Sequence, residues 1–271
     1  MKSNYRNFAI VLAVGSISLL QACQKDDQFN PQLDQVALSN TERKVNSVNT
    51  FYSSTLPIGN GVGRAWVSEN NNGEPVAVGV NLSEKALMNL PAEPTEYVLI
   101  LPKNKGKNFY THVLLDWNPQ GHEPEFAYGL PHFDVHFYII PNEDRLAIGP
   151  NDNIQFDNLP DPVYVPFAYG RGPGGVPQMG VHWIDFLAPE FNGGTFTKTF
   201  IWGSYDGKFI FWEPMITRAY LLTHSNSITD IRQPDAYQND GYYATQYKVS
   251  YSASPKEYSI ALVNLVYHEG E

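Results

Sequence analysis

The residues best suited to chemistry lie between His112 and Tyr138, a stretch that holds four of the seven histidines of the chain. Within it, residues 131–138 are rich in aromatic and β-branched side chains, which predicts an extended strand. Because side chains alternate between the two faces of a strand, His132, Asp134 and His136 share one face. Imidazole and carboxylate groups in such a row can bind a divalent metal ion.

The spacing of this row limits how it can bind an ion. At about 3.3 Å of rise per residue, the Cα atoms of His132 and His136 lie about 13 Å apart in a straight strand. We therefore expect Asp134 to act with one of these histidines, or with both if a bulge shortens the strand. Alternatively, the row is structural and Asp134 fixes the tautomer of a packing histidine, since the spacing is not that of a standard zinc motif.

Other segments must complete a metal site. His122, in the turn-rich GHEP segment, and His182, in the MGVHW segment, are the nearest candidates by residue type. We expect His182 to approach the row around one polar pocket, with Gly180 on its face leaving room. The predicted metal ligands are His122, His132, Asp134, His136 and His182, with Glu213 as a further candidate.

Nitrogen and oxygen ligands without thiolate suit Zn, Fe, Mn, Cu or Ni. Such a centre would serve either catalysis or metal handling, and the sequence leaves open whether the protein is an enzyme. If it is, Glu213 or Glu123 is the predicted general base.

The N-terminal segment has the pattern of a bacterial lipoprotein signal. Lys2 and Arg6 precede an apolar run, residues 8–20, and Leu-Gln-Ala-Cys follows with Cys23 as its last residue. This pattern predicts a signal peptide over residues 1–23, cleavage before Cys23 and acylation of that cysteine. The residues after Cys23 resemble the acidic export tag of surface lipoproteins. We therefore expect a lipid anchor in the outer membrane or at the cell surface.

Charge and cysteine content narrow the classes of partner. The chain carries 18 basic and 28 acidic residues, a net charge of −10. Loss of residues 1–23 removes two basic residues and no acidic ones, which makes the net charge −12. This charge argues against nucleic acid as a partner and favours cations. The single cysteine excludes an internal disulfide.

The remaining sequence predicts a flexible tether over residues 24–48 and a single β-rich domain over residues 49–271. Most of the domain reads as short strands separated by Gly, Pro and Asn, with a helix over 83–88 and helix-like composition over 143–148. The Gly-rich residues 170–175 predict a loop near the centre. The expected fold is all-β, an antiparallel sandwich or barrel of jelly-roll or cupin-like type with one or two short helices. The expected strands cover 62–67, 75–80, 97–101, 111–117, 132–140, 163–169, 195–202, 208–212, 216–222, 242–251 and 258–267.

Several motifs together resemble a small family of uncharacterised bacterial secreted or lipoprotein domains, first described from a thermophile protein under extracytoplasmic sigma-factor control. The motifs are WNP at 117–119, GHEP at 121–124, PHFDVHFY at 131–138, MGVHW at 179–183, GSYDGK at 203–208 and EPMIT at 213–217. The resemblance covers residues 61–222. It implies a β-rich fold and an envelope location, and it supplies no reaction.

Two functions from different classes therefore stand. The first is an envelope lipoprotein with a metal-dependent site of cupin-like character, its ligands on strands inside a sandwich. The second is a non-catalytic surface module that binds a protein, a glycan or its own copies, in which the His/Asp row is structural; a homo-oligomer is compatible with either.

Overall fold

Segments of alternating hydrophobic and polar residues form most of the fold, because alternation places one side of each strand against a core. The computed structural model describes residues 48–102 and 109–271. These residues belong to one compact unit. The predicted signal peptide with Cys23, and the predicted tether except for its last residue, lie outside the described residues.

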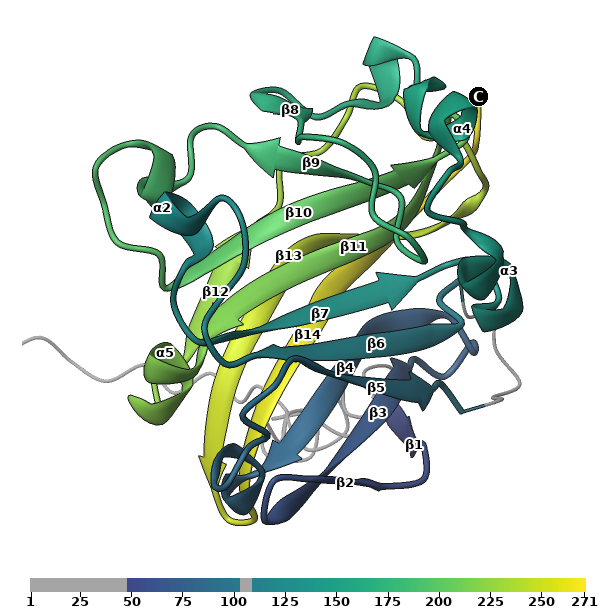
Figure 1. The fold of residues 1–271 in the computed structure, drawn as a ribbon. Helices are drawn as coiled ribbons and strands as arrows, with labels where there is room; N and C mark the ends of the chain where they lie inside the picture. The colour runs from purple at the N-terminus through teal and green to yellow at the C-terminus, as the bar shows by residue number, and fades with distance from the viewer. Residues whose placement is uncertain (1–47, 103–108) are drawn as a thin grey trace, which may run out of the picture. The chain divides into compact units, whose positions relative to one another are not determined.

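The strands form two antiparallel sheets of seven strands each (Figure 1). In the first sheet the order is β1-β3-β4-β14-β13-β12, and β2 pairs with β3 at one side. The strands of this sheet are β1 (Asn49–Tyr52), β2 (Leu56–Ile58), β3 (Gly61–Glu69), β4 (Pro75–Ser83), β12 (Ser227–Asp230), β13 (Gly241–Ala253) and β14 (Lys256–His268).

The second sheet has the order β5-β6-β7-β11-β10-β9-β8. Its central strands β7 and β11 come from distant parts of the sequence, with Asp134 opposite Met215. The strands are β5 (Thr95–Ile100), β6 (His112–Asn118), β7 (His132–Tyr138), β8 (Tyr169–Arg171), β9 (Val181–Asp185), β10 (Lys198–Tyr205) and β11 (Lys208–Thr217).

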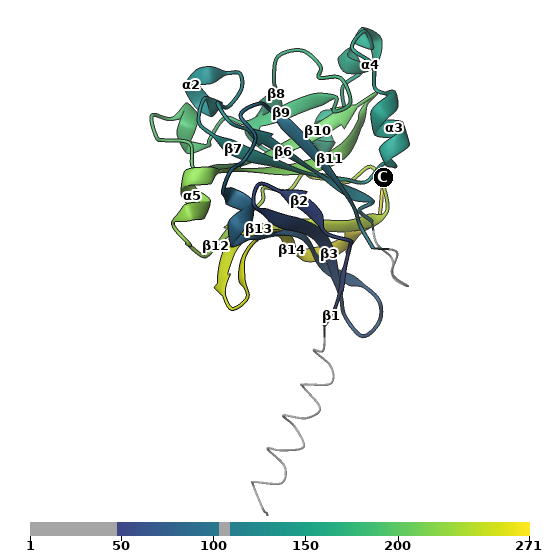
Figure 2. The same cartoon turned by 60° about the horizontal axis from the view of Figure 1, so that its bottom comes forward.

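The main hydrophobic core lies between the two sheets, which stack as a sandwich (Figure 2). Phe133, Val135 and Phe137 of β7 belong to this core. The alternate side chains of β7 therefore lie on the outer face of the second sheet. Two smaller apolar clusters cover parts of that face, one around Phe211 and the other around Tyr128. The predicted all-β sandwich is confirmed, and no closed barrel forms among the described strands.

Helices are short, and α2, α3 and α4 lie on the outer-face side of the second sheet (Figure 1). In the described part of the chain, none is long and apolar enough to cross a membrane. The α-helices are α2 (Glu125–Tyr128), α3 (Asn142–Ala147), α4 (Asn153–Asp157) and α5 (Arg218–Leu222), and the 3₁₀-helices are η1 (Glu84–Leu87), η2 (Pro162–Tyr164) and η3 (Pro189–Phe191).

Two expected strands are wrong. Residues 163–168 form the end of η2 and a loop, because prolines at 162 and 166 cannot donate to a ladder, and β8 begins only at Tyr169. Residues 216–222 were expected as one strand, but β11 ends at Thr217 and α5 begins at Arg218. The Thr217 hydroxyl caps this helix by accepting a hydrogen bond from the Tyr220 amide.

Candidate metal centre

Strand β7 presents His132, Asp134 and His136 on the outer face of the second sheet, and all three are buried. The strand forms because Phe133, Val135 and Phe137, all aromatic or β-branched, pack into the core between the sheets. The polar row therefore lies outside the sandwich core. This corrects the expectation that the ligands lie on strands inside a sandwich.

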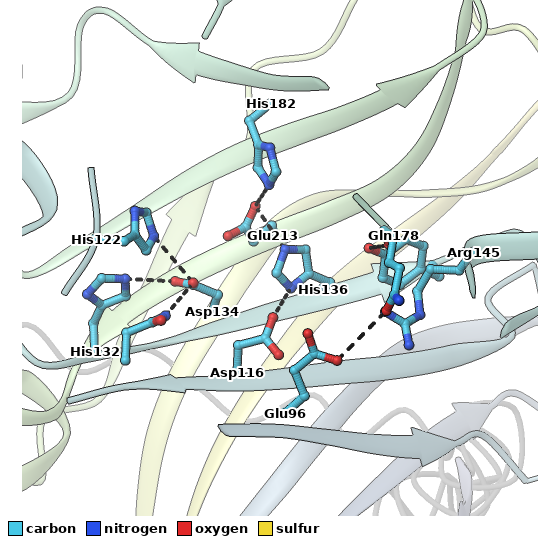
Figure 3. A network of polar contacts seen from close by, with 12 residues as sticks. Glu96, Asp116, His122, His132, Asp134, His136, Arg145, Gln178, His182 and Glu213 are labelled. Atoms are coloured by element: carbon cyan, nitrogen blue, oxygen red, sulfur yellow. Dashed lines mark hydrogen bonds and ion pairs between the residues drawn. The ribbon is translucent and has the colours of Figure 1, made fainter. Parts of the chain in front are cut away.

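The first ligand group consists of His122, His132 and Asp134 (Figure 3). His132 Nε2 lies 3.0 Å from Asp134 Oδ1, and His122 Nε2 lies 3.4 Å from Asp134 Oδ2. His122 comes from the loop between β6 and α2, and its side chain keeps 38% of its surface exposed. The first ligand group is therefore open to solvent on the His122 side.

Backbone carbonyls fix both imidazoles of this group. His132 Nδ1–H donates to the Leu130 carbonyl at 2.6 Å, and His122 Nδ1–H donates to the Glu123 carbonyl at 2.8 Å. In the neutral rings this leaves the Nε2 lone pairs free, and both face Asp134. Metal-binding histidines are typically held in this way, with the distal nitrogen anchored to an acceptor.

The second ligand group consists of His136, His182 and Glu213, from β7, β9 and β11. Glu213 Oε2 lies 3.5 Å from His136 Nε2 and 3.6 Å from His182 Nε2. The side chains of His136 and Glu213 are almost fully buried, whereas 22% of the His182 side chain is exposed. One carboxylate oxygen thus faces two imidazole nitrogens.

Strand β6 supplies polar partners to both groups. Asp116 Oδ2 lies 3.2 Å from His136 Nδ1, on the ring side opposite Glu213. The Asn118 amide donates a hydrogen bond to Asp134 Oδ2 at 2.7 Å. Both residues reach the row because β6 and β7 pair in a register that sets Asp116 opposite Asp134.

The close contacts within these groups join ring nitrogens to carboxylate oxygens as ion pairs. His132 Nε2 and Asp134 Oδ1 are only 3.0 Å apart, and His136 Nε2 and Glu213 Oε2 are 3.5 Å apart. Burying such groups without partners would cost on the order of 1 to 3 kcal/mol each.

The distances suit a shared metal ion. Bonds of about 2.0 to 2.2 Å at tetrahedral angles place neighbouring ligand atoms roughly 3.3 to 3.6 Å apart. In each group the three ligand atoms lie within 4.8 Å of one another, and several pairs already have the required separation. Two imidazoles and one carboxylate are also a donor set of known metal sites. The residues therefore fit a divalent ion in each group.

Burial and mutual charge alter the protonation of the second group. Burial raises the pKa of Glu213 to about 8. Burial opposes protonation of His136, yet the carboxylates of Glu213 and Asp116 outweigh it and raise its pKa to about 9. Burial, followed by the neighbouring His136, lowers the pKa of His182 to about 3. His182 is therefore a neutral imidazole with a free lone pair at neutral pH.

The first group is biased towards an ionised carboxylate. Burial raises the pKa of Asp134, but His132 and His122 together hold it well below its usual range. For His122, burial lowers the pKa and the Asp134 carboxylate raises it more strongly, to about 9. The ionised Asp134 carboxylate would attract a metal ion to the first ligand group.

A cavity of about 550 Å³ opens beside both groups. Asp134, His136, His182, Glu213 and His122 contribute to its wall. Its volume lies within the range of small-molecule sites, roughly 300 to 1,000 Å³. Residues 172 and 173, from the Gly-rich segment expected near the centre, also line it.

The structure thus brings all predicted ligands to one region but divides them. His132 and His136 fall into different groups, and Asp134 is grouped with one histidine of its strand, His132. The rings of His136 and His182 are 6.1 Å apart. Glu123 lines the cavity, and its carboxylate accepts a hydrogen bond from the Glu125 amide. A general-base role for Glu123 or Glu213 stays a prediction.

Sequence reasoning missed Asp116 and Asn118. The signal was partly present, because Asp116 alternates with core-facing residues along the strand expected at residues 111–117, and Asn118 continues the alternation one residue beyond it. This alternation places Asp116 and Asn118 beside the row only once the register between β6 and β7 is known. Tyr128 and Glu96 also line the cavity and were not anticipated.

The fold and these groups define a class, a β-sandwich protein with His/carboxylate clusters able to hold metal on the outer face of one sheet. Residues 70–117 match the family model TTHB210-like, described as hypothetical protein TTHB210. This match agrees with the resemblance to an uncharacterised thermophile family. It ends at Trp117, before the GHEP, PHFDVHFY, MGVHW, GSYDGK and EPMIT motifs. No curated protein and no solved structure matches the chain.

Proposed function

We propose that this protein binds divalent transition-metal ions, one at each ligand group on the outer face of the second sheet. The observation that carries the proposal is the geometry around Asp134. Two histidines have their Nδ1–H groups tied to carbonyls and turn Nε2 towards this carboxylate at 3.0 and 3.4 Å. Both imidazoles thus converge on the two oxygens of one buried carboxylate.

A bound ion would supply Lewis-acid chemistry, or redox chemistry for Fe, Mn or Cu. The residues of the chain would hold it and shape its surroundings. His132 and Asp134 are fixed on a central strand, whereas His122 is on a partly exposed loop. Asp116 orients His136 from the far side of its ring. The adjoining cavity gives a small molecule access to both groups.

A cobalt titration tests this proposal. The full chain, purified without a histidine tag and stripped with a chelator, should develop visible Co²⁺ absorption bands on titration. Asp134→Asn and Glu213→Gln should each remove part of the signal, because each removes the anionic ligand of one group while keeping the side-chain shape. Asp230→Asn, an exposed carboxylate on β12, is the matched control. An unchanged titration in both site variants would refute the proposal.

A non-catalytic binding module is the second candidate. Ion pairs that need no metal favour this candidate. His132 pairs with Asp134 in the row, and His136 pairs with Asp116 of β6. In that case the row would stabilise the fold as an ion-pair network, and the protein would bind a glycan or protein partner elsewhere. Absence of Co²⁺ binding together with binding on a glycan array would support this second function.

We also propose that the protein is attached to the outer membrane or cell surface through an acylated Cys23. Support comes from the basic residues, the apolar run and the Leu-Gln-Ala-Cys sequence at the N-terminus. An envelope location suits a net negative protein that captures cations rather than nucleic acid.

A further inference from the structure

The wall of the cavity beside the two ligand groups holds more acidic than basic side chains. Five carboxylates line it, and among the described residues that line it none is Lys or Arg. The five are Glu96, Asp116, Glu123, Asp134 and Glu213. The Arg145 guanidinium, whose Nη1 is 4.0 Å from Glu96, is buried outside the lining. The wall therefore offers no guanidinium or ammonium group to clamp an anion.

Metal ions do not reverse this charge. With all five carboxylates ionised, the protonated rings of His122 and His136 offset two negative charges in the metal-free cavity, and two divalent ions bound to neutral rings offset four. The cavity thus stays negative at either occupancy. A small anion entering it would face net repulsion in a partly desolvated space, where charges interact more strongly than in water.

The rest of the wall is largely apolar. Trp117 from β6, Ile184 from β9 and Ile201 from β10 share the lining with Val176 and Met179 from the connection before β9. Such a surface recovers free energy when it covers an apolar ligand body, about 25 cal/mol per Å². Carboxylates beside an apolar wall suit a molecule with an apolar part and a neutral or positive polar part.

We infer that the ligand or substrate of this centre is a neutral or cationic small molecule with an apolar body, and that phosphate esters and carboxylates are excluded. This inference rests on the proposed function, since it assigns the ligand to the cavity of the metal centre. The inference narrows the candidate ligands of the metal centre to amines, alcohols and uncharged carbonyl compounds.

A matched set of probes tests the inference. Benzylammonium, benzyl alcohol, benzoate and phenyl phosphate share one aromatic body and differ in charge. Ligand-observed NMR with the full chain, both metal-loaded and chelator-treated, gives their dissociation constants. We expect benzylammonium and benzyl alcohol to bind at least about tenfold more tightly than either anion, a difference of about 1.4 kcal/mol. Equal or tighter binding of benzoate or phenyl phosphate, or no binding by any probe, would overturn the inference.

A charge-neutralising pair of substitutions locates the effect. Glu96→Gln with Glu123→Gln removes two wall charges without touching either ligand group. The preference for benzylammonium over benzoate should shrink, while metal content stays unchanged. Glu143→Gln with Glu269→Gln removes two exposed charges outside the lining and should leave the preference intact. An equal change in both double variants would refute a cavity effect.

Metal analysis of the same samples distinguishes failure of the ligand inference from failure of the proposed metal-binding function. Bound metal with tighter benzoate binding would overturn the inference and leave the proposed function standing. A cationic preference without bound metal would overturn the proposed function while the charge selectivity of the cavity stands.

Discussion

His132 turns its second ring nitrogen to Asp134, since its Nδ1–H donates to the Leu130 carbonyl and its Nε2 lies 3.0 Å from Asp134 Oδ1. The carbonyl fixes the ring in one tautomer. A neutral ring in this position presents a lone pair to a carboxylate, and a cation between or beside them removes that repulsion. His122 likewise has its Nδ1–H tied to a carbonyl, that of Glu123, and its Nε2 lies 3.4 Å from Asp134 Oδ2.

Asp116 and Asn118 on β6 should each affect the metal affinity of a different ligand group. Asp116→Asn should weaken metal binding at the second group by about 10- to 100-fold, because it removes the carboxylate beside His136 Nδ1. Asn118→Ser should weaken the first group instead, because the Asn118 amide holds Asp134 Oδ2. Competition titrations with a zinc-sensitive dye measure both affinities. Wild-type affinities in both variants would show that β6 plays no part.

His112 should make stability depend on pH. Burial, then the charge of Arg145, lowers the pKa of this fully buried histidine to about 4. The unfolded chain takes up the proton near pH 6.5, so the stabilisation is complete above that pH and is lost as the pH falls through 4. The loss is on the order of 3 kcal/mol.

Urea unfolding of the wild type and His112→Gln over this pH range checks the effect. The variant should be less stable at pH 7 and should show a flatter loss of unfolding free energy between pH 6.5 and 4. Parallel pH profiles for the two proteins would rule out His112 as the source.

The sequence suffices to predict which residues gather at the candidate site. It does not predict how they divide into two ligand groups. Alternation along β7 suffices to place His132, Asp134 and His136 on one face, and residue type singles out His182 and Glu213. Which histidine joins which carboxylate depends on pairings between distant strands, such as Gly203 opposite His182. A single sequence carries no signal for those pairings.

The prediction of strands from the sequence is limited in the same way as the prediction of the site. Long alternating segments such as β13 and β14 are evident from their pattern, whereas β9, with five residues, and β12, with four, were not anticipated. Short strands contain too few alternations to differ from loops. Their positions are decided by the neighbours they pair with.

Gly180 should be indispensable for placing His182. Its φ of +101° disfavours any side chain, and a Cβ there would lie 2.3 Å from the Ser204 carbonyl oxygen. Gly180→Ala should therefore cost more than the roughly 1 to 2 kcal/mol of left-handed strain alone, and should reduce metal binding at the second group. Gly174→Ala is the control, with φ +67° and nothing within 4 Å. Thermal unfolding and metal titration of both variants test this, and equal effects would contradict it.

Cys23 should be the membrane attachment. Cys23→Ser should leave an unlipidated protein that is soluble or retains its signal peptide, because acylation requires the thiol. Fractionation of cells after a carbonate wash, followed by immunoblotting, gives the distribution. Continued recovery of the variant in the outer-membrane fraction would contradict the lipoprotein proposal.

The number of metal ions per chain tests the central claim most directly. The full chain, purified without a histidine tag and equilibrated with Zn²⁺, should contain about two ions by mass spectrometry, one for each ligand group. His132→Ala and His136→Ala should each lower this number and the melting temperature together, because ligand loss removes binding energy linked to folding. His224→Ala, which removes a ring stacked on Tyr251, should leave the number unchanged. A metal content below about one tenth of an ion per chain, or one that both site variants retain in full, would contradict the claim.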